Sequence, residues 1–357
     1  MRVHASSADP GGGTRAAEHT QMFIEAQSAS AAVLAQLRED AHAIEALGAA
    51  IRALSPRAVI TCARGSSDHA ATYAKYLIET RARVLTASAA PSVSSVYGID
   101  QDLRGCLFIA ISQSGRSPDL LASVAAAKHS GALVVALCNS DDAPLLSAAD
   151  HVIPLRAGPE ISVAATKSYL ATLAALARLV AAWTRNAALQ AAIASLPALM
   201  DRAWLLDWTS ALPLLQTADH LYVVGRGLGL GAAQEVALKC KETCGLHAES
   251  FSGAEVRHGP FALLGPQFPA LLLAQNDATR AGTEALANEL AARGVPVFIA
   301  GSAAASGAHV LPAIDCPAEL GPVLAVQSAY RMIAALSVRR GFDPDRPASL
   351  SKITETL

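Results

Sequence analysis

Two stretches of this sequence share one pattern: an apolar run, a turn of small residues and an alanine-rich helix. The first, ITCARGSSDHAATYAKYLIET, begins at Ile60, and the second, YVVGRGLGLGAAQEVALKCKE, begins at Tyr222. They align without a gap and place Arg64-Gly65 on Arg226-Gly227. We therefore expect a tandem duplication of one α/β unit, with chance matching of small residues as the alternative.

Short apolar runs also alternate with helical patterns through both halves of the chain. The strand-like runs are residues 58–62, 83–87, 107–111, 133–138 and 151–155, and then 220–224, 270–274, 297–300 and 310–314. The clearest helical runs are residues 21–54, 70–80, 118–130, 144–148, 166–185, 232–244, 278–293 and 318–340. Such a βαβ series predicts an α/β fold with parallel sheets that are covered by helices on both faces.

The same pattern divides the chain into parts, and 357 residues suffice for two cores of ordinary size. The expected parts are a flexible tail (1–20), a helical segment (21–54), a first domain (55–190), a helical connector (191–216), a second domain (217–340) and a C-terminal tail (341–357).

Charge and hydropathy exclude several classes of function. A net charge of −2 gives no sign of a general attraction to nucleic acid or to an anionic membrane, so any anion site must be local. The N-terminus lacks the apolar core of a signal peptide. The most apolar helical run, residues 169–183, is interrupted by Arg178 and is too short to span a bilayer. We therefore expect a cytoplasmic protein without nucleic-acid or membrane partners.

The six cysteines are scattered, mostly within apolar runs, which is typical of buried thiols in a reducing compartment. Cys240, Cys244 and His247 could be proposed as a zinc site, but no second pair of ligands has the spacing of such a site. The sequence therefore predicts no metal.

Residues 105–119, GCLFIAISQSGRSPD, combine a buried strand with a polar loop. The apolar run is followed by Ser112-Gln113-Ser114-Gly115-Arg116-Ser117, and Ser117-Pro118-Asp119 then has the N-cap, the first-turn proline and the acid of a helix start. Backbone N–H groups, hydroxyls and a helix dipole that converge in this way favour a bound phosphoryl group. An ordinary, well-capped βα turn is the alternative.

A second cluster of titratable residues lies in the other half of the chain. Lys239 and Glu242 are three residues apart and so share one face of a helix that Gly245 ends. Because Glu235 lies four residues before Lys239, a solvent-exposed row of ion pairs is the alternative. The loop that follows, residues 247–260, is dense in glycine and titratable groups. A carboxylate, a lysine and a histidine together suit proton transfer next to a carbonyl.

The motif Gly227-x-Gly229-x-x-Ala232, with Glu249 twenty residues after Gly229, also fits the fingerprint of a dinucleotide site. A nicotinamide dehydrogenase is therefore one alternative. The matching turn of the first half, Arg64-Gly65-Ser66-Ser67-Asp68, has hydroxyls in place of the close-approach glycines, which argues against it.

Six motifs, taken in order along the chain, resemble those of the sugar isomerase (SIS) domain family. They are Gly65-Ser66-Ser67, Ser112-Gln113-Ser114-Gly115, Val163-Ala164-x-Thr166-Lys167, Lys239-x-Lys241-Glu242, Glu255-x-x-His258-Gly259-Pro260 and Leu350-Ser351-Lys352. The resemblance extends from about Met22 to the C-terminus. Over this range the chain also resembles the isomerase half of glucosamine-6-phosphate synthase. It implies two tandem SIS domains, each a parallel flavodoxin-like sheet with helices on both faces.

The resemblance also implies roles for individual residues. The residues implied to bind the substrate are Ser112, Gln113, Ser114 and Ser117 at the phosphate and Ser67, Val163 and Ala164 along the sugar chain. Glu242 would move a proton between C1 and C2, with Lys239 beside it. His258, from the neighbouring subunit of a homodimer, would open the ring. Lys352, on a tail that closes over the site, matches a lysine that can form an imine with a keto sugar. No metal or redox cofactor is implied.

Two departures from the synthase pattern shape the expected activity. The synthase carries an N-terminal glutaminase domain before the isomerase half, whereas here only a short stretch precedes the resemblance, so we expect no synthesis of an amino sugar from glutamine by this chain alone. The loop after Gly115 is similar to that of stand-alone SIS glucosamine-6-phosphate deaminases. Within it, Arg116 would either add charge beside the phosphate or face water.

We therefore expect a glucosamine-6-phosphate deaminase that converts glucosamine 6-phosphate and water to fructose 6-phosphate and ammonia. Alternatives of the same class are a phosphosugar isomerase, a deglycase of sugar-phosphate amine adducts, and the isomerase half of a glutamine:fructose-6-phosphate aminotransferase. A non-catalytic sugar-phosphate sensor is an alternative of another class. A sensor needs no groups for proton transfer, and the presence of four such residues therefore argues against it: Glu242, Lys239, His258 and Lys352.

Overall fold

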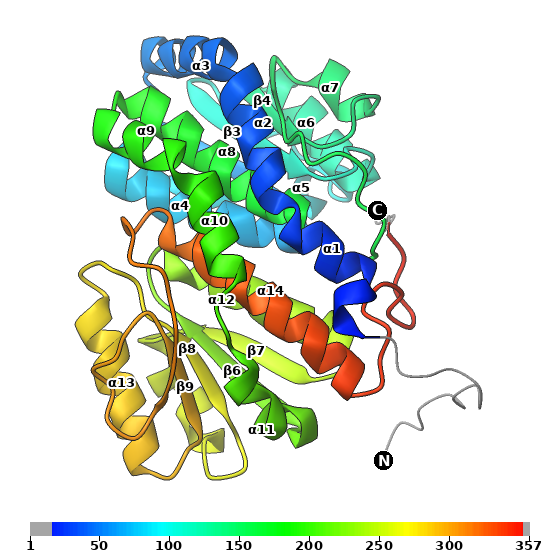
Figure 1. The fold of residues 1–357 in the computed structure, drawn as a ribbon. Coiled ribbons are helices and arrows are strands. Elements are labelled where there is room, and N and C mark those ends of the chain that lie inside the picture. The colour runs from blue at the N-terminus through cyan, green and yellow to red at the C-terminus, as the bar shows by residue number, and fades with distance from the viewer. Residues whose placement is uncertain (1–15, 353–357) are drawn as a thin grey trace.

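Two five-stranded parallel sheets form the framework of the protein (Figure 1). The structure is a computed structural model and describes residues 16–352. The strand order is β2-β1-β3-β4-β5 in the first sheet and β10-β9-β8-β6-β7 in the second. Counted within its own half, each sheet has its strands in the flavodoxin-like order 2-1-3-4-5. The predicted fold class, α/β with two tandem parallel sheets, is confirmed.

The strands are β1 (Ala58–Cys62), β2 (Thr86–Ser88), β3 (Cys106–Ser112), β4 (Leu133–Cys138), β5 (His151–Pro154), β6 (His220–Gly225), β7 (His247–Ser252), β8 (Ala270–Leu273), β9 (Val297–Ala300) and β10 (His309–Leu311). The α-helices are α1 (Gln21–Gln27), α2 (Ala29–Glu39), α3 (Ala41–Leu54), α4 (Ser66–Arg81), α5 (Ser92–Ser95), α6 (Pro118–His129), α7 (Pro144–Ala148), α8 (Lys167–Thr184), α9 (Ala187–Ala194), α10 (Leu196–Trp204), α11 (Leu212–Thr217), α12 (Gly229–Cys244), α13 (Arg280–Ala292) and α14 (Gly321–Arg339). Short 3-10 helices are η1 (Ala17–His19), η2 (Thr209–Ala211), η3 (Glu255–Arg257) and η4 (Pro260–Leu263).

Helices cover both faces of each sheet, which explains the continuous apolar runs. Successive side chains of a strand point to opposite faces. In β3, Leu107 and Ile109 join the central core of the molecule, whereas Phe108 and Ala110 join a separate cluster beneath α6 and α7. The second sheet divides in the same way between the central core and a cluster beneath α13. Burial on both faces favours apolar residues at successive positions of a central strand, as in residues 107–111 of β3.

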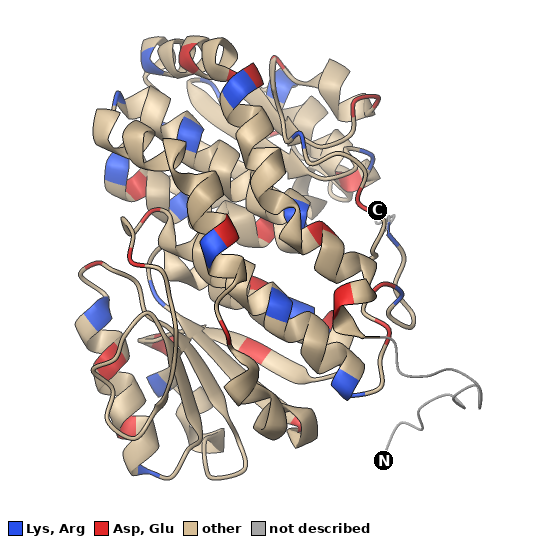
Figure 2. Cartoon of the chain, in the orientation of Figure 1, with Lys and Arg blue, Asp and Glu red and all other residues tan. Residues whose placement is uncertain are grey.

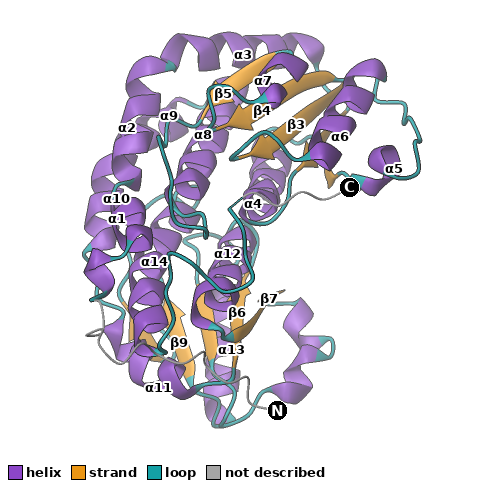
Figure 3. Cartoon of the chain, turned by 90° about the vertical axis from the view of Figure 1, so that its right-hand side faces the viewer, coloured by secondary structure: helices purple, strands orange, loops and turns teal. Residues whose placement is uncertain are grey.

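The two halves meet through helices that lie between the sheets (Figure 3). The central core combines α4 and α8 of the first half with α12 and α14 of the second. Two of these helices approach closely at Gly231 on α12, where an added Cβ would lie 2.4 Å from the backbone oxygen of His69 on α4. Only glycine lets the two helix backbones come this near, so the helices of the duplicated units pack directly on each other.

From their first strands to the start of α6 and α13, the two halves also correspond at a constant offset. The first strands begin at Ala58 and His220, and helices α6 and α13 begin at Pro118 and Arg280, so that both pairs differ by 162 residues. The serine loop, residues 112–117, therefore corresponds to residues 274–279.

The sequence prediction was wrong for the segment after α12, which we expected to be a loop. Residues 247–252 instead form β7, an edge strand that pairs in parallel with β6. Its polar residues, such as His247 and Glu249, are exposed while Ala248 is buried. An edge strand with one solvent-exposed side needs few apolar residues, so β7 lacks the apolar run by which the other strands were predicted.

Three further boundaries differ from the prediction. The helical run of residues 21–54 consists of three helices that are interrupted at Ser28 and Asp40. The predicted strand at residues 83–87 begins only at Thr86, because Arg83 has a φ of 59°, in the left-handed region. Of the predicted flexible tail, residues 1–15 lie outside the described residues, and Ala17–His19 forms η1.

Acidic and basic residues are interspersed over both halves in the view of Figure 2, in keeping with the small net charge. Among residues 16–352, no helix combines the length and the apolar character that crossing a bilayer requires.

Candidate active site

A cavity of about 350 Å³ lies where the carboxyl ends of β1 and β3 meet α12. Here the strand order of the first sheet reverses, which is where open α/β sheets bind ligands. Its lining includes Ser67, Ser112, Gln113, Ser114, Ser117 and Val163 from the first half, Lys239 and Glu242 from the second half, and Leu350, Ser351 and Lys352 from the C-terminal segment. The structure therefore brings most of the predicted site residues together around one cavity.

The serine loop, residues 112–117, makes a tight turn at the end of β3. Gly115 has a φ of 62°, and a Cβ there would lie 2.6 Å from Ala143 Cβ and 2.8 Å from Cys138 Sγ, so this turn requires glycine. The Ser112 hydroxyl accepts a hydrogen bond of 2.9 Å from the Gly115 N–H. Ser117 is the N-cap residue of α6, but its side chain makes no capping hydrogen bond. Its hydroxyl is therefore available to an anion, whereas in the first turn of α6 Pro118 has no N–H and the Leu120 N–H is donated to the Asp119 carboxylate at 2.8 Å.

Arg116 points away from this cavity. It forms an ion pair of 2.8 Å with Asp142, and both side chains are exposed. Of the two alternatives for Arg116, the structure favours a solvent-exposed side chain.

Lys239 and Glu242 project from α12 into the same cavity. The Lys239 ammonium is buried, with 1% of its side chain exposed, and is paired with Glu242, whose side chain is 22% exposed. Its other partner, Glu235, lies 3.5 Å away and is fully buried. The alternative of a solvent-exposed row of ion pairs is wrong, because this row lies between the two halves, packed against α4 and α14.

Glu235 connects three helices around Lys239. Its carboxylate accepts hydrogen bonds from the Ser66 hydroxyl at 3.2 Å and the Tyr330 hydroxyl at 2.8 Å, and it lies 3.0 Å from His69 Nδ1. Burial alone would raise the pKa of Glu235, but the Lys239 charge and these hydrogen bonds outweigh it, and the pKa is lowered. Burial alone would lower the pKa of Lys239, but Glu235 and Glu242 raise it. Lys239 therefore remains an ammonium beside Glu242.

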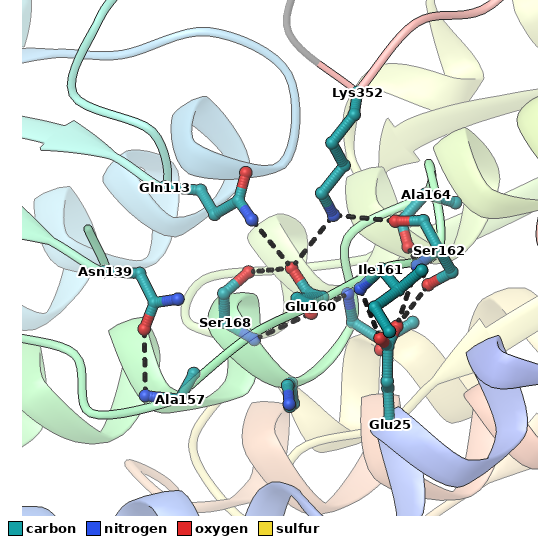
Figure 4. Close-up of polar contacts among 12 residues, drawn as sticks. Glu25, Gln113, Asn139, Ala157, Glu160, Ile161, Ser162, Ala164, Ser168 and Lys352 are labelled. Carbon is teal, nitrogen blue, oxygen red and sulfur yellow. Dashed lines mark hydrogen bonds and ion pairs between the residues drawn. The ribbon is translucent and has the colours of Figure 1, made fainter.

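The C-terminal segment passes beside the serine loop and carries Lys352 to the cavity (Figure 4). The Lys352 ammonium donates a hydrogen bond of 2.6 Å to the backbone oxygen of Ser162 and lies 3.4 Å from Glu160. The remaining five residues of the predicted tail, 353–357, lie outside the described residues.

Two predicted residues do not line the cavity. Ala164 is buried behind it, and its backbone oxygen accepts a hydrogen bond from Ser162. His258 is exposed immediately after η3, and it is not part of the cavity lining within this chain.

Sequence reasoning missed two features next to the site. One is the buried carboxylate of Glu160, and the other is the hydrogen-bond network around the buried carboxylate of Glu235. The side chain of Glu160 is fully buried, and its partners are Gln113 and Lys352, which are 47 and 192 residues away in the sequence. No local spacing could have revealed these contacts. Glu235 did have a signal, its spacing from Lys239, but burial decides whether such a pair is structural.

Other candidate sites receive less support from the structure. Cys240 and Cys244 are buried, and burial raises the pKa of Cys244 to about 12. His247 is on β7 with its ring nitrogen 3.1 Å from that of His220. In the described part of the chain, no group of three or more His, Cys, Asp or Glu residues could hold a metal ion.

The turn that fitted a dinucleotide fingerprint is occupied by protein. A Cβ on Gly229 would lie 2.9 Å from the amide nitrogen of Gln275, so this side chain fills the space in front of the turn. A larger cavity of about 510 Å³ lies farther along this sheet edge, between the ends of β8, β9 and β10. None of the predicted site residues lines it, and we therefore place the candidate site in the smaller cavity.

Comparison with protein-family models matches residues 54–182 and 214–310 to the SIS domain. Among curated proteins, the glutamine–fructose-6-phosphate aminotransferase (isomerizing) of Legionella pneumophila (strain Lens) is 32% identical over 306 residues, which are 82% of this chain and 50% of that protein. The chain thus spans about half the length of the curated relatives that it matches.

Two solved structures are also similar. The "putative phosphosugar isomerase" of Silicibacter pomeroyi DSS-3 has a TM-score of 0.88 and 39% identity, and the match covers 91% of this chain and 100% of that one. The glucosamine-6-phosphate deaminase of Thermotoga maritima has a TM-score of 0.75 and 19% identity, covering 94% of this chain and 100% of that one. The second likeness shows a shared fold alone.

Proposed function

Because this chain belongs to the SIS domain family, we propose that it converts glucosamine 6-phosphate and water to fructose 6-phosphate and ammonia. Its relatives support an isomerase role. The observation that carries the proposal is the meeting of two halves at one cavity: a phosphate-type loop from the first and a lysine–carboxylate pair from the second.

The serine loop would hold the phosphate. Ser112, Ser114 and Ser117 supply hydroxyls, and the start of α6 supplies the positive end of its dipole. Ser67 and the backbone near Val163 and Ala164 would lie along the sugar chain. Glu242 and Lys239, on the opposite wall, would then face the carbons farthest from the phosphate.

Proton transfer would follow ring opening. The open sugar has an aldehyde at C1 and an amine at C2. Glu242 would remove the C2 proton, and Lys239 would stabilise the oxygen that becomes negative at C1. Return of the proton to C1 would leave a negative oxygen on C1 and an iminium group at C2. A proton that passes from this nitrogen to the oxygen gives the C1 hydroxyl and the neutral imine, and water would hydrolyse the imine to the ketone and ammonia.

Ring opening needs an acid or base, and His258, which the resemblance implies for this step, is not among the lining residues in the described part of this chain. His258 is exposed, and we propose that a second copy of the chain supplies it to a site shared across a homodimer. Lys352 lines the cavity and would be available to form an imine with the keto sugar. Mixed dimers of E242Q and H258A variants should regain activity that neither variant has alone, and no recovery on mixing would place ring opening within one chain.

One other candidate is the reverse direction of the same chemistry. The curated relatives are aminotransferases that act on fructose 6-phosphate, so a chain with this cavity could also accept ammonia and form the amino sugar. Both directions would use the same cavity and the same proton transfer.

The decisive experiment is an assay of purified chain with glucosamine 6-phosphate, in which ammonia and fructose 6-phosphate are measured separately. We expect them in equal amounts. Interconversion of glucose 6-phosphate and fructose 6-phosphate without ammonia release would instead identify a plain isomerase. Binding of the sugar phosphate without any product would identify a sensor. Formation of glucosamine 6-phosphate from fructose 6-phosphate and ammonium would show that the reverse direction is available.

A further inference from the structure

The carboxylate of Glu160 is the centre of a polar cluster beside the candidate active site (Figure 4). It follows the first sheet in the segment that leads into α8. Its side chain is fully buried, and such a carboxylate must have all of its lone pairs matched by donors. Those donors come from the start of α8, a few residues after Glu160, and from two distant parts of the chain, the serine loop and the C-terminal segment.

The two oxygens of Glu160 have different partners. Oε1 accepts the backbone N–H groups of Thr166 at 2.9 Å and Ser168 at 3.1 Å, and so caps the start of α8. Oε2 accepts the Ser168 hydroxyl at 2.6 Å. The same Oε2 lies 3.4 Å from the Gln113 amide nitrogen and 3.4 Å from the Lys352 ammonium. One oxygen is thus shared by the serine loop and the C-terminal segment.

The C-terminal segment is fixed at two points on either side of the cavity. Upstream, the Asp345 carboxylate accepts the N–H groups of Gln21 and Met22, and the Asp345 backbone oxygen accepts the Val163 N–H. Downstream, Lys352 is held by Glu160 and by the backbone oxygen of Ser162. Leu350 and Ser351, between these points, line the cavity. The contact at Lys352 therefore sets how closely this segment covers the cavity.

We propose that Glu160 is a positioning residue that couples the occupant of the serine loop to the C-terminal segment through Gln113 and Lys352. An anion in the loop attracts the Gln113 amide N–H groups. Glu160 Oε2 then loses one donor and pairs more strongly with the Lys352 ammonium, which holds the segment over the occupied cavity. Coupling of this kind is reciprocal, so a held segment also favours the bound anion.

The inference rests on the proposed phosphosugar site, but only on anion binding there and not on turnover. Lys352 itself supplies the probe, because trypsin cleaves after lysine and must draw this side chain into its own pocket. Cleavage of the bond between Lys352 and Ile353 removes the last five residues and is followed by intact mass. Its rate reports how often Lys352 leaves its partners.

The test variant is E160Q in the full chain. Glutamine keeps Oε1 as acceptor for the N–H groups that cap α8, but it replaces Oε2 with a donor that repels both Gln113 and Lys352. The matched control is E25Q. Glu25 is also buried and accepts the N–H groups of Ile161 and Ser162 in the same segment. Its hydrogen bonds do not include Gln113 or Lys352. Melting temperatures verify that both variants fold.

In the unmodified chain, we expect cleavage after Lys352 to be slow and to become slower with inorganic phosphate or fructose 6-phosphate. E160Q should be cleaved roughly tenfold faster, as expected for loss of one charge-assisted contact, and phosphate should no longer protect it. E25Q should still be protected by phosphate.

Three results would overturn the proposal: cleavage of E160Q at the rate of the unmodified chain, equal protection of E160Q by phosphate, or an equal acceleration in E25Q. Equal protection would mean that the anion attracts Lys352 directly. An equal effect in E25Q would mean that the cleavage rate depends on the general order of the segment that leads into α8, and not on the contact between Glu160 and Lys352. If calorimetry detects no sugar-phosphate binding at all, the proposed function fails, whereas the comparison of ligand-free cleavage rates still tests the hold of Glu160 on Lys352.

Discussion

The two halves of this protein have the same strand order and correspond at one residue offset up to α6 and α13, yet each contributes a different part of the candidate site. The first half has hydroxyls in the loop after its third strand. The second has Asn276 and Asp277 where the first has Ser114 and Gly115. Conversely, Lys239 and Glu242 on α12 correspond to Leu77 and Thr80 on α4.

The loop of the second half is closed by its own side chains. The Asp277 carboxylate accepts hydrogen bonds from the Thr279 N–H at 2.8 Å and the Thr279 hydroxyl at 2.6 Å. A carboxylate thus binds the N-cap residue of α13. In the first half, the carboxylate at the helix start, Asp119, pairs instead with the Leu120 N–H and with Arg64, and the Ser117 hydroxyl makes no capping hydrogen bond, so it can still bind an external anion. Gln275 fills the space before the glycine turn. The comparison teaches that a repeated unit can retain its backbone while its anion site is replaced by an internal one.

The largest effect is expected at the proton-transfer group of the second half. Glu242→Gln keeps the size of the side chain and removes the base, so turnover of glucosamine 6-phosphate should fall roughly 10²- to 10⁴-fold. Affinity for the sugar phosphate, measured by calorimetry, should change less than about threefold, because the phosphate contacts are in the other half.

Lys241→Gln is the matched control for this prediction. Lys241 is one residue away on α12 and is exposed, so its substitution should leave turnover near that of the unmodified chain. Loss of binding by E242Q with an unchanged kcat would contradict the assignment of phosphate binding to the first half and proton transfer to the second.

The next effect tests the division from the other side. Ser114→Ala should weaken binding of fructose 6-phosphate roughly 10- to 100-fold, as expected for loss of a hydrogen bond to a charged group. Asn276→Ala, at the corresponding position of the second half, should leave the dissociation constant unchanged. Equal weakening by both substitutions in a titration would show that both loops bind anions and would break the comparison.

A smaller effect is expected where the halves touch. Gly231→Ala places a methyl group 2.4 Å from a backbone oxygen of α4, and overpacking of this kind costs about 1–3 kcal/mol of stability. The melting temperature should fall by several degrees. Gly265→Ala, where nothing lies within 4 Å of the added atom, should leave it nearly unchanged. Equal melting temperatures for the two variants would mean that α4 and α12 can separate without cost.

The contrast between the halves also explains what the sequence could predict. Runs such as residues 58–62 and 133–138 were placed correctly because strands that are buried on both faces favour apolar residues at successive positions. The serine loop and the pair on α12 were visible as local motifs. Strand β7 was not, because it is an edge strand with polar residues on its wet side. The cluster around Glu160 was invisible, because two of its donors, Gln113 and Lys352, come from distant segments that only the folded chain brings together.

The smallest effect concerns the one charged residue of the serine loop. Arg116 corresponds to Ala278 in the second half, so Arg116→Ala makes the two loops more alike. The guanidinium is paired with Asp142 at the surface, and such exposed pairs contribute little. Affinity for fructose 6-phosphate should therefore change less than about threefold, with the same dependence on salt as the unmodified chain. A tenfold loss that disappears at high salt would mean that Arg116 leaves Asp142 to contact the phosphate, and the anion site of the first half would then depend on a charge as well as on its hydroxyls.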